Sequence, residues 1–474
     1  MPITRRNLLR MAAGALPGAG RAVPTRRPNI LFLFTDDQRF NTLHALNNSG
    51  IHTPNMDRLV RRGVTFTKAC IMGGTIGAVC APSRAMLMTG QSLFHVTDSI
   101  VNPRAGADSV ARPFVMFPEL LRQNGYRTFG TGKWHNGEAL YARCFSDGGS
   151  IFFGGMSDHL QVPVADFDRS GKYPEDARRT GAKFSSELFS DAAVNFLEHY
   201  KGDDPFCLYV AYTAPHDPRM APAKYANLYP WQKIPLPKNF LPRHPFDNGE
   251  LEIRDEQLGP FPRTPDSVRQ SIAGYYAMIT EVDEQMGRVL QALEKSGRAD
   301  DTIVVFASDN GLALGQHGLM GKQNLYDHSI RVPLVIGGPG LPRGKRVDSL
   351  CYLMDLFPTF CDMTGLRTPE SVEGKSLMPA ITGKHKHVRD SVFLAYKDFQ
   401  RAVRTDAWKL ILYNVAGRET TQLFDMRHDA LEERNLAGDP AQAARIRELR
   451  ALLKKWMAET QDRADLDKPN WGRG

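Results

Sequence analysis

The sequence lacks long apolar runs, closely spaced cysteine pairs and internal repeats. No segment reaches the roughly 18 apolar residues that a membrane-spanning helix needs. The absence of a repeat period excludes solenoid folds. With 474 residues and 42% hydrophobic content, the chain can bury one large core and form a smaller second domain. No C-x-x-C pair suggests a metal site, so we expect mostly buried, apolar thiols at Cys70, Cys80, Cys144, Cys207, Cys351 and Cys361.

The positive charge is concentrated partly at the N-terminus. The net charge is +8, but residues 1–22 hold four arginines and no acid, so their removal leaves 8 − 4 = +4. This segment has paired Arg5 and Arg6, a short apolar stretch and small residues, the layout of a twin-arginine export signal. The alternative is a basic N-terminal tail. We therefore expect a periplasmic or secreted protein without a nucleic-acid partner or a transmembrane segment.

Short apolar runs alternate with helical patterns along the first 340 residues. This alternation predicts an α/β fold, with a large, mostly parallel or mixed sheet sandwiched by helices. Two helices are predicted, one from Pro54 after an N-cap Thr53 to Gly63, and one over 267–297. The runs that read as buried strands are 29–35, 127–131, 206–212, 302–308 and 332–338.

Polar residues follow four of these strands directly. In such a sheet, ligands bind beyond the carboxyl ends of the strands. Singly, an Asp after a strand is commonly a turn former, but clustered carboxylates repel each other unless a cation neutralises them. An all-oxygen set favours Ca²⁺, with Mg²⁺ as the alternative. The side chains concerned are Asp36, Asp37, Lys133, His135, His216, Asp217, Asp309 and Asn310.

The stretch CAPSRAMLMTG at 80–90 resembles the signature C-x-P-S-R-x-x-x-(L/M)-T-G of the type I sulfatases, within the alkaline phosphatase superfamily. Further motifs occur in the order typical of that family: GKWHNG at 132–137, APHDPR at 214–219, SDNG at 308–311, GKQNLYDHSIRVPL at 321–334 and LFDMRHDALEERNLA at 423–437.

The resemblance implies that Cys80 is oxidised to formylglycine by a maturation enzyme that reads Pro82 and Arg84. One hydroxyl of the aldehyde hydrate would attack the sulfate ester, and the other would expel sulfate. The implied metal ligands are Asp36, Asp37, Asp309, Asn310 and the modified Cys80.

The resemblance also implies roles for other side chains. Arg84 would hold the hydrate, Lys133 and Lys322 would bind sulfate oxygens, and His135 would act as the base. His216, with Lys322, would protonate the leaving alcohol. Asp217, Arg219 and His317 are candidate substrate contacts.

The pattern changes towards the C-terminus. We expect 347–366 to be a helix of the large domain. Beyond it, short alternating strands and an amphipathic helix over 440–462 predict a small antiparallel sheet with a helix on it, in which Arg401 or Arg404 could shape the substrate pocket. The expected division is a signal over 1–22, a catalytic domain over 28–385 and a small α+β subdomain over 386–474.

The function predicted from these features is hydrolysis of sulfate from a sulfated carbohydrate, as in polysaccharide degradation. Two alternatives remain open. A phosphonate or phosphate ester hydrolase of the same superfamily can share the cysteine signature and the metal site. A non-catalytic glycan or nucleic-acid binder with the same fold would account for the positive charge.

Overall fold

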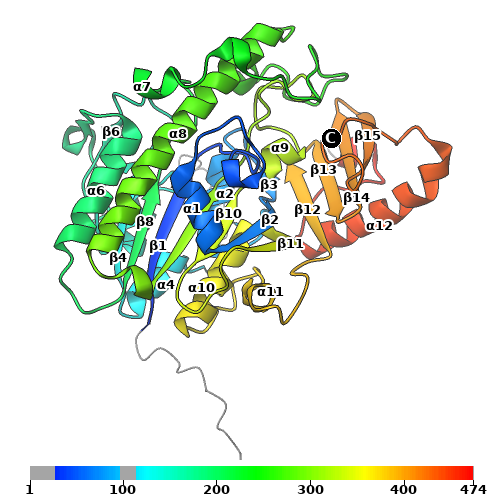
Figure 1. Cartoon of the computed structure of the whole chain (residues 1–474). Coiled ribbons are helices and arrows are strands. Elements are labelled where there is room, and N and C mark those ends of the chain that lie inside the picture. The colour runs from blue at the N-terminus through cyan, green and yellow to red at the C-terminus, as the bar shows by residue number, and fades with distance from the viewer. Residues whose placement is uncertain (1–26, 97–113, 473–474) are drawn as a thin grey trace, which may run out of the picture.

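The structure is a computed structural model that describes residues 27–96 and 114–472, so the predicted signal over 1–22 lies outside the described residues. Its largest element is an eight-stranded sheet (Figure 1) with the order β11-β2-β10-β9-β1-β8-β4-β5. Its strands are β1 (Asn29–Thr35), β2 (Val64–Cys70), β4 (Arg127–Lys133), β5 (Asp147–Phe152), β8 (Phe206–Ala211), β9 (Thr302–Ser308), β10 (Leu334–Gly337) and β11 (Lys345–Tyr352).

The sheet is mixed, because β10 runs antiparallel to both of its neighbours. The other pairs in the sheet are parallel. The four strands whose ends carry the predicted functional residues lie side by side, in the order β9-β1-β8-β4. Their carboxyl ends therefore converge on one edge of the sheet, as the sequence predicted.

Helices cover both faces of the sheet, and the alternation along β1 shows why. Ile30, Phe32 and Phe34 belong to the hydrophobic core on one face, whereas Leu31 and Leu33 belong to the core on the other. The first core includes residues of α2 (Cys80–Thr89), α4 (Phe117–Gln123) and α10 (Leu356–Thr364), and the second those of α1 (Pro54–Arg62), α6 (Ser185–His199) and α8 (Pro265–Lys295).

The expectation of a helix over 347–366 is wrong in its first part. Residues 345–352 form β11, which pairs in parallel with β2, and the helix α10 begins only at Leu356. The physical reason is that Val347, Leu350 and Tyr352 bury their side chains against the sheet, and an apolar run of this length suits a buried strand as well as a helix.

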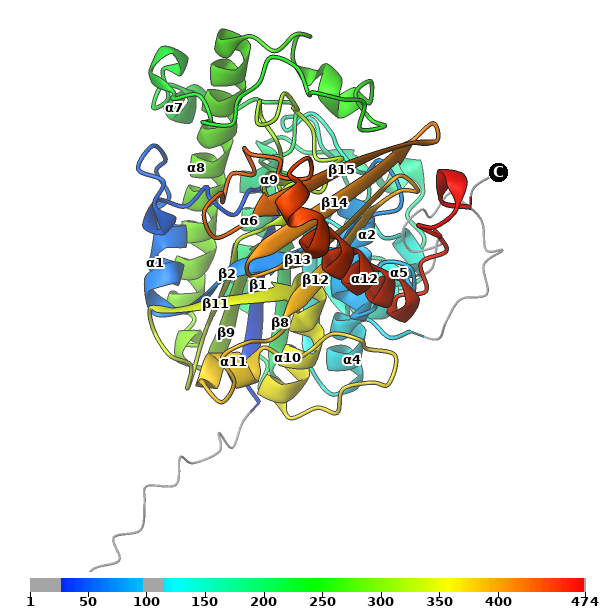
Figure 2. The ribbon, with the colours of Figure 1, turned by 90° about the vertical axis from the view of Figure 1, so that its right-hand side faces the viewer.

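A second sheet of five strands, with the order β15-β14-β13-β12-β3, carries α12 (Ala443–Glu459) on one face (Figure 2). Its strand β3 (Gly73–Gly74) comes from the N-terminal half, and a Cβ at Gly73 would lie 1.9 Å from the carbonyl oxygen of Ala395. The small sheet is thus joined to the large domain through backbone pairing. Its remaining strands are β12 (Ser391–Tyr396), β13 (Gln400–Thr405), β14 (Trp408–Val415) and β15 (Arg418–Asp425).

The remaining helices and strands are short: α5 (Glu138–Cys144), β6 (Pro163–Val164), β7 (Arg179–Thr180), α7 (Ala223–Ala226), α9 (Asp327–Ile330) and α11 (Met378–Thr382). All six cysteines are buried and free of disulfides, which confirms the expectation of buried thiols. Across the described ranges, no helix combines the length and apolar character needed to cross a bilayer.

Candidate active site

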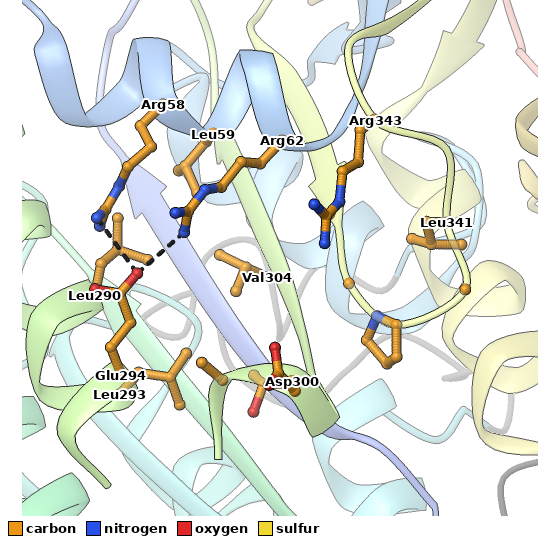
Figure 3. Close-up of a pocket in the computed structure, with 16 residues that line it drawn as sticks. Arg58, Leu59, Arg62, Leu290, Leu293, Glu294, Asp300, Val304, Leu341 and Arg343 are labelled. Atoms are coloured by element: carbon orange, nitrogen blue, oxygen red, sulfur yellow. Dashed lines mark hydrogen bonds and ion pairs between the residues drawn. The ribbon is translucent and has the colours of Figure 1, made fainter. Parts of the chain in front are cut away.

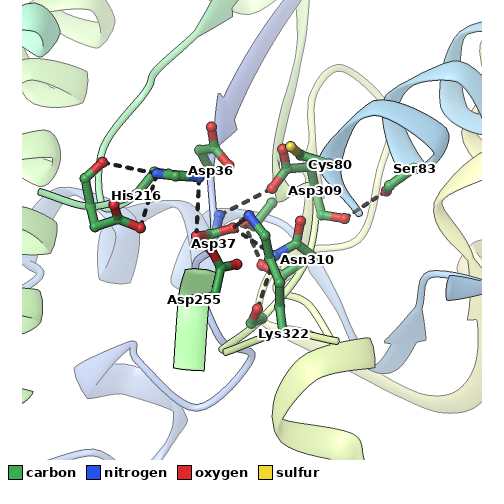
Figure 4. A network of polar contacts seen from close by, with 12 residues as sticks. Asp36, Asp37, Cys80, Ser83, His216, Asp255, Asp309, Asn310 and Lys322 are labelled. Atoms are coloured by element: carbon green, nitrogen blue, oxygen red, sulfur yellow. Dashed lines mark hydrogen bonds and ion pairs between the residues drawn. The ribbon is translucent and has the colours of Figure 1, made fainter. Parts of the chain in front are cut away.

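Three aspartates and an asparagine meet at the carboxyl ends of β1 and β9 (Figure 4). Because Thr35 and Ser308 are register partners on neighbouring strands, the residues that follow them are adjacent. The backbone N–H of Asp37 donates to Asp309 Oδ1 at 3.1 Å, and Asn310 Nδ2 donates to Asp37 Oδ1 at 2.7 Å. All four side chains are buried.

Cys80 lies beside these carboxylates at the first turn of α2. Its Sγ is 3.4 Å from His135 Nδ1 and 3.5 Å from Lys133 Nζ. Oxygen atoms of Asp36 and Asp309 and the Cys80 Sγ all lie within 4.8 Å of one another. The thiol is only 2% exposed, and burial raises its pKa.

The helix that carries Cys80 is held against the carboxylates by its own side chains. Ser83 Oγ donates to the Asp309 carbonyl oxygen at 2.6 Å, and Arg84 Nε donates to Asp309 Oδ2 at 2.9 Å. Arg84 Nη1 also donates to the Lys133 carbonyl oxygen at 2.8 Å. Ser83 and Arg84 lie within the signature at 80–90, and the contacts of their side chains therefore also position α2.

Two lysines neutralise part of the negative charge. Lys133 forms an ion pair with Asp36, and Lys322 Nζ donates to Asp37 Oδ1 at 2.6 Å. Burial favours the neutral form of Asp37, but Lys322 and His216 outweigh it and lower its pKa. We call the group Asp36, Asp37, Arg84, Lys133, Asp309 and Lys322 the catalytic cluster.

The remaining carboxylates are not fully compensated. Burial and the nearby Asp36 raise the pKa of Asp309 to about 6, and burial also raises the pKa of Asp36 despite its contact with Lys133. Oδ1 of Asp36 and Oδ1 of Asn310 are buried and have no hydrogen-bond partner among the described residues. Unpartnered oxygens among mutually repelling carboxylates fit a hard divalent cation, so this aspartate-rich site can hold one.

Two histidines lie at the edge of the cluster. His216 Nε2 is 3.8 Å from Asp37 Oδ2, and its Nδ1 lies 2.9 Å from the Asp217 carbonyl oxygen. Burial lowers the pKa of His216 to about 4, and burial together with Lys133 lowers the pKa of His135. Both rings are therefore neutral near pH 7 in the structure described.

The three candidate substrate contacts lie in different surroundings. Asp217 forms a bidentate ion pair with Arg254, beside His216. Arg219 donates to the Pro215 carbonyl oxygen at 2.9 Å and lies over Tyr275, whose hydroxyl donates to the Asp37 carbonyl oxygen. His317 packs elsewhere, and its substrate role stays a prediction.

The contacts of His317 are with a neighbouring part of the core. Its ring stacks on Tyr326 with centroids 4.0 Å apart, and its Nε2 donates to the Glu432 carbonyl oxygen at 3.0 Å. The suggestion that Arg401 or Arg404 shapes the pocket is not supported by their geometry. Both are buried, Arg401 in an ion pair with Asp462 and Arg404 in one with Asp327.

Sequence reasoning missed the segment that bears Arg254. This residue opens a short 3₁₀ helix, and its side chain remains 45% exposed while it pairs with Asp217 and Asp255. Asp255 in turn accepts a hydrogen bond from Gln323 Nε2 at 2.7 Å, next to Lys322. The segment follows no strand and carries no motif, so nothing in its local sequence places it here.

Comparisons with known proteins identify the family. A family model described as Sulfatase matches residues 28–366, and one described as N-sulphoglucosamine sulphohydrolase, C-terminal, matches residues 315–460. A sulfatase of Formosa agariphila is 30% identical, over 92% of this chain and 88% of that protein. An N-acetylglucosamine-6-O-sulfatase of Bacteroides thetaiotaomicron is 28% identical, with the same coverage of each chain.

Solved structures show the same fold. One protein, in complex with its substrate D-glucosamine-2-N,6-O-disulfate, superposes with a TM-score of 0.78 at 25% identity, over 94% of this chain and 100% of that one. The phosphonate monoester hydrolase of Agrobacterium radiobacter is similar in fold alone, with a TM-score of 0.71 at 24% identity, over 92% and 96% of the two chains.

Proposed function

This chain belongs to the sulfatase family and is a sulfuric ester hydrolase, and we propose that its substrate is a sulfated carbohydrate. The relative that is named for N-acetylglucosamine 6-O-sulfate and the structure bound to a sulfated glucosamine support this substrate class. The observation that carries the catalytic proposal is the position of Cys80, within 3.5 Å of both a lysine and a histidine and beside the carboxylates of Asp36 and Asp309.

We propose that Cys80 is converted to formylglycine, which when hydrated supplies a hydroxyl nucleophile and a second hydroxyl whose deprotonation releases sulfate. A buried thiol of raised pKa is a poor nucleophile, which supports the modification. Because Cys80 is 2% exposed on a helix, the maturation enzyme must act before the chain folds around it.

We propose that Asp36, Asp37, Asp309, Asn310 and residue 80 hold a divalent metal, Ca²⁺ in preference to Mg²⁺. The all-oxygen donors and their irregular arrangement favour the larger ion. The cation would offset the repulsion that raises the pKa of Asp309, and its chemistry would be to lower the pKa of a hydroxyl bound there.

The surrounding side chains would orient the sulfate group and move protons. Lys133 and Lys322 present ammonium groups on either side of the carboxylates, where they can neutralise sulfate oxygens. Arg84 Nη2 has no hydrogen-bond partner within the described ranges, so it can donate to a hydroxyl on residue 80. His135 lies near enough to Cys80 to take a proton from such a hydroxyl.

His216 is the proposed acid for the leaving alcohol. Its Nδ1 donates to a backbone oxygen, which leaves Nε2 free to carry a second proton. A bound sulfate adds negative charge beside the ring, which favours the protonated form. General acid catalysis of this kind is worth roughly 10²–10⁴-fold. Asp217 and Arg219, and at a greater distance His317, remain proposed substrate contacts.

The experiment that tests the reaction compares matched esters. We expect 4-nitrophenyl sulfate to be hydrolysed with a kcat/KM at least about 100-fold above that for the corresponding phosphonate and phosphate esters. The reverse order would favour the phosphonate hydrolase alternative. A protein whose Cys80 peptide has the formylglycine mass, yet turns over none of these esters or sulfated sugars, would instead be a binder.

We also propose the domain division at 385/386 and export through the segment 1–22 to the periplasm or beyond. Twin-arginine export moves folded proteins, so the modification of Cys80 should precede export. Peptide mass analysis of the cytoplasmic fraction tests this, because only unmodified thiol there would contradict it.

A further inference from the structure

Away from the catalytic cluster, a polar cavity lies at the amino end of β9 in the large sheet (Figure 3). It has a volume of about 370 Å³ and is lined by the end of α1, the end of α8 and the loop 338–344. Because β10 is antiparallel to β9, with Gly337 opposite Val304, this loop leaves the sheet at the amino end of β9. Asp309 of the catalytic cluster directly follows the other end of β9, five residues and about 17 Å beyond Val304.

Three arginines converge on this cavity from two separate segments. Arg58 and Arg62 are one turn apart on α1, and Arg343 belongs to the loop 338–344. In Figure 3 the guanidinium groups of Arg58 and Arg62 point to Glu294, whereas that of Arg343 reaches the cavity from the loop on the other side of the view. Arginine is well suited to bind tetrahedral oxyanions, because its planar fork donates two parallel hydrogen bonds.

The cavity does not satisfy these guanidinium groups internally. Arg58 and Arg62 both contact a single atom, Glu294 Oε1, at 3.3 Å and 3.0 Å. Arg343 forms no hydrogen bond or ion pair within ranges 27–96 and 114–472. The other acid that lines the cavity, Asp300, likewise has no ion-pair partner in the described part of the chain. The cavity is thus lined by three positive and two negative side chains. Some guanidinium N–H groups therefore have no acceptor within the described part of the chain.

A role limited to fastening α1 to α8 accounts for only part of this arrangement. Glu294 on α8 contacts Arg58 and Arg62, and this contact ties the two helices together. Arg343 takes no part in it and comes from neither helix, yet it lines the same cavity.

The other residues that line the cavity suit a ligand of about the size of a sugar ring. Leu59, Leu290, Leu293 and Val304 form an apolar side, and residues 337–340, Gly-Gly-Pro-Gly, bring the backbone to the opposite wall. At φ +73°, Gly340 holds a conformation that other residues adopt only with strain. A volume in the range of small-molecule sites, with charged donors on one side and an apolar wall, is typical of a ligand pocket.

We propose that this basic pocket is an accessory site that binds a sulfate or phosphate ester group carried on a sugar-sized ring. The anion would lie between Arg62 and Arg343, and the ring would pack on Leu59 and Val304, which are only partly buried. The proposal does not depend on turnover, so it can be tested apart from the proposed function.

The test measures binding by calorimetry to the Cys80→Ala protein, which cannot form the nucleophile. Probes with a common ring are N-acetylglucosamine 6-sulfate, N-acetylglucosamine 6-phosphate and unmodified N-acetylglucosamine, with inorganic sulfate as a fourth. We expect Arg343→Gln and Arg62→Gln to weaken one binding event for the charged sugars about tenfold. The matched control is Arg367→Gln, because Arg367 is 89% exposed and lies outside the cavity.

Each outcome of these binding measurements supports or overturns a part of the proposal. A stronger response to the sulfate ester or to the phosphate ester identifies which group the pocket accepts. Equal binding of the neutral sugar, or losses no greater than in Arg367→Gln, would overturn the proposal. Inorganic sulfate binding as tightly as the esters would overturn recognition of the ring. In the enzyme that retains Cys80, Arg343→Gln should leave kcat/KM for 4-nitrophenyl sulfate unchanged, which separates this site from the catalytic one.

Discussion

The catalytic cluster can be compared with a second buried group of charged side chains. The carboxylates of the two groups differ in the charged residues that contact them. The second group, which we call the Asp327 cluster, joins α9 and the loop after it to the small sheet. Cationic atoms of Arg331, Arg404 and Lys409 lie 3.0, 3.2 and 3.1 Å from the Asp327 carboxylate. Lys409 also contacts Glu432 at 2.7 Å.

The pKa of Asp327 shifts in the opposite direction to the pKa values of Asp36 and Asp309. Burial favours the neutral form of Asp327, but Arg404 and Lys409 outweigh it and lower its pKa. In the catalytic cluster, burial and carboxylate repulsion raise the pKa of Asp36 and Asp309. The negative charge of a buried carboxylate that is surrounded by protein cations is already compensated. Carboxylates that face each other need an additional cation to compensate their charge. The first arrangement supports the fold and the second creates a site.

The largest effect should come from Cys80→Ala. Loss of the nucleophile should lower kcat by at least about 10⁴-fold, while the midpoint of thermal unfolding changes little because only one sulfur atom is removed. Hydrolysis of 4-nitrophenyl sulfate measures this. Cys207→Ala, another buried cysteine, is the matched control and should keep its activity; substantial turnover by Cys80→Ala would refute the proposed nucleophile.

Paired substitutions in the two clusters test the comparison directly. Asp309→Asn should lower kcat/KM on the order of 10³-fold and change the free energy of unfolding by less than about 1 kcal/mol without metal. Asp327→Asn leaves buried cations uncompensated, so it should lower the free energy of unfolding by about 3–5 kcal/mol. Urea unfolding and kinetics per folded molecule measure both. If Asp309→Asn proved the more destabilising, the distinction between the clusters would be wrong.

Metal removal sharpens the same contrast. After chelation, added Ca²⁺ at 100 times its Kd should raise the free energy of unfolding by about 2.7 kcal/mol and restore activity. Asp309→Asn should lose this response and Asp327→Asn should retain it. Thermal unfolding with and without Ca²⁺ gives the measurement, and an equal response in both variants would place the metal elsewhere.

The smallest effect is a pH dependence next to the Asp327 cluster. Burial lowers the pKa of His317 to about 4, whereas an unfolded histidine titrates near 6.5. Between these values the unfolded state binds more protons, so the free energy of unfolding falls as pH is lowered. From pH 7 to pH 5 this loss is about 2 kcal/mol. His317→Gln should reduce that loss, and an unchanged pH slope would show that the ring is not buried and neutral.

Much of the catalytic site was predictable because its residues follow strands. Asp36 comes directly after a buried strand and Asp309 after another, and parallel strands bring their carboxyl ends to one edge. The cysteine signature and the separated motifs then indicated the family. The strand over 345–352 was less predictable, because an apolar run of that length fits a strand or a helix equally well.

The other features depend on residues far apart in the chain. Arg254 reaches Asp217 from a segment without a motif, and Asp327 meets Arg404 and Lys409 across the boundary between the two sheets. The cavity between α1, α8 and the loop 338–344 arises only when β10 turns antiparallel to β9.

The sequence by itself determined five strands of the large sheet, the order of the motifs and the residue types of the catalytic cluster, because these depend on local periodicity and on spacing along the chain. The tertiary structure alone decided how many cations contact each carboxylate and which carboxylates face each other. That difference depends on the distances between side chains from different elements and on their removal from water, and both are set only when the sheets and helices pack.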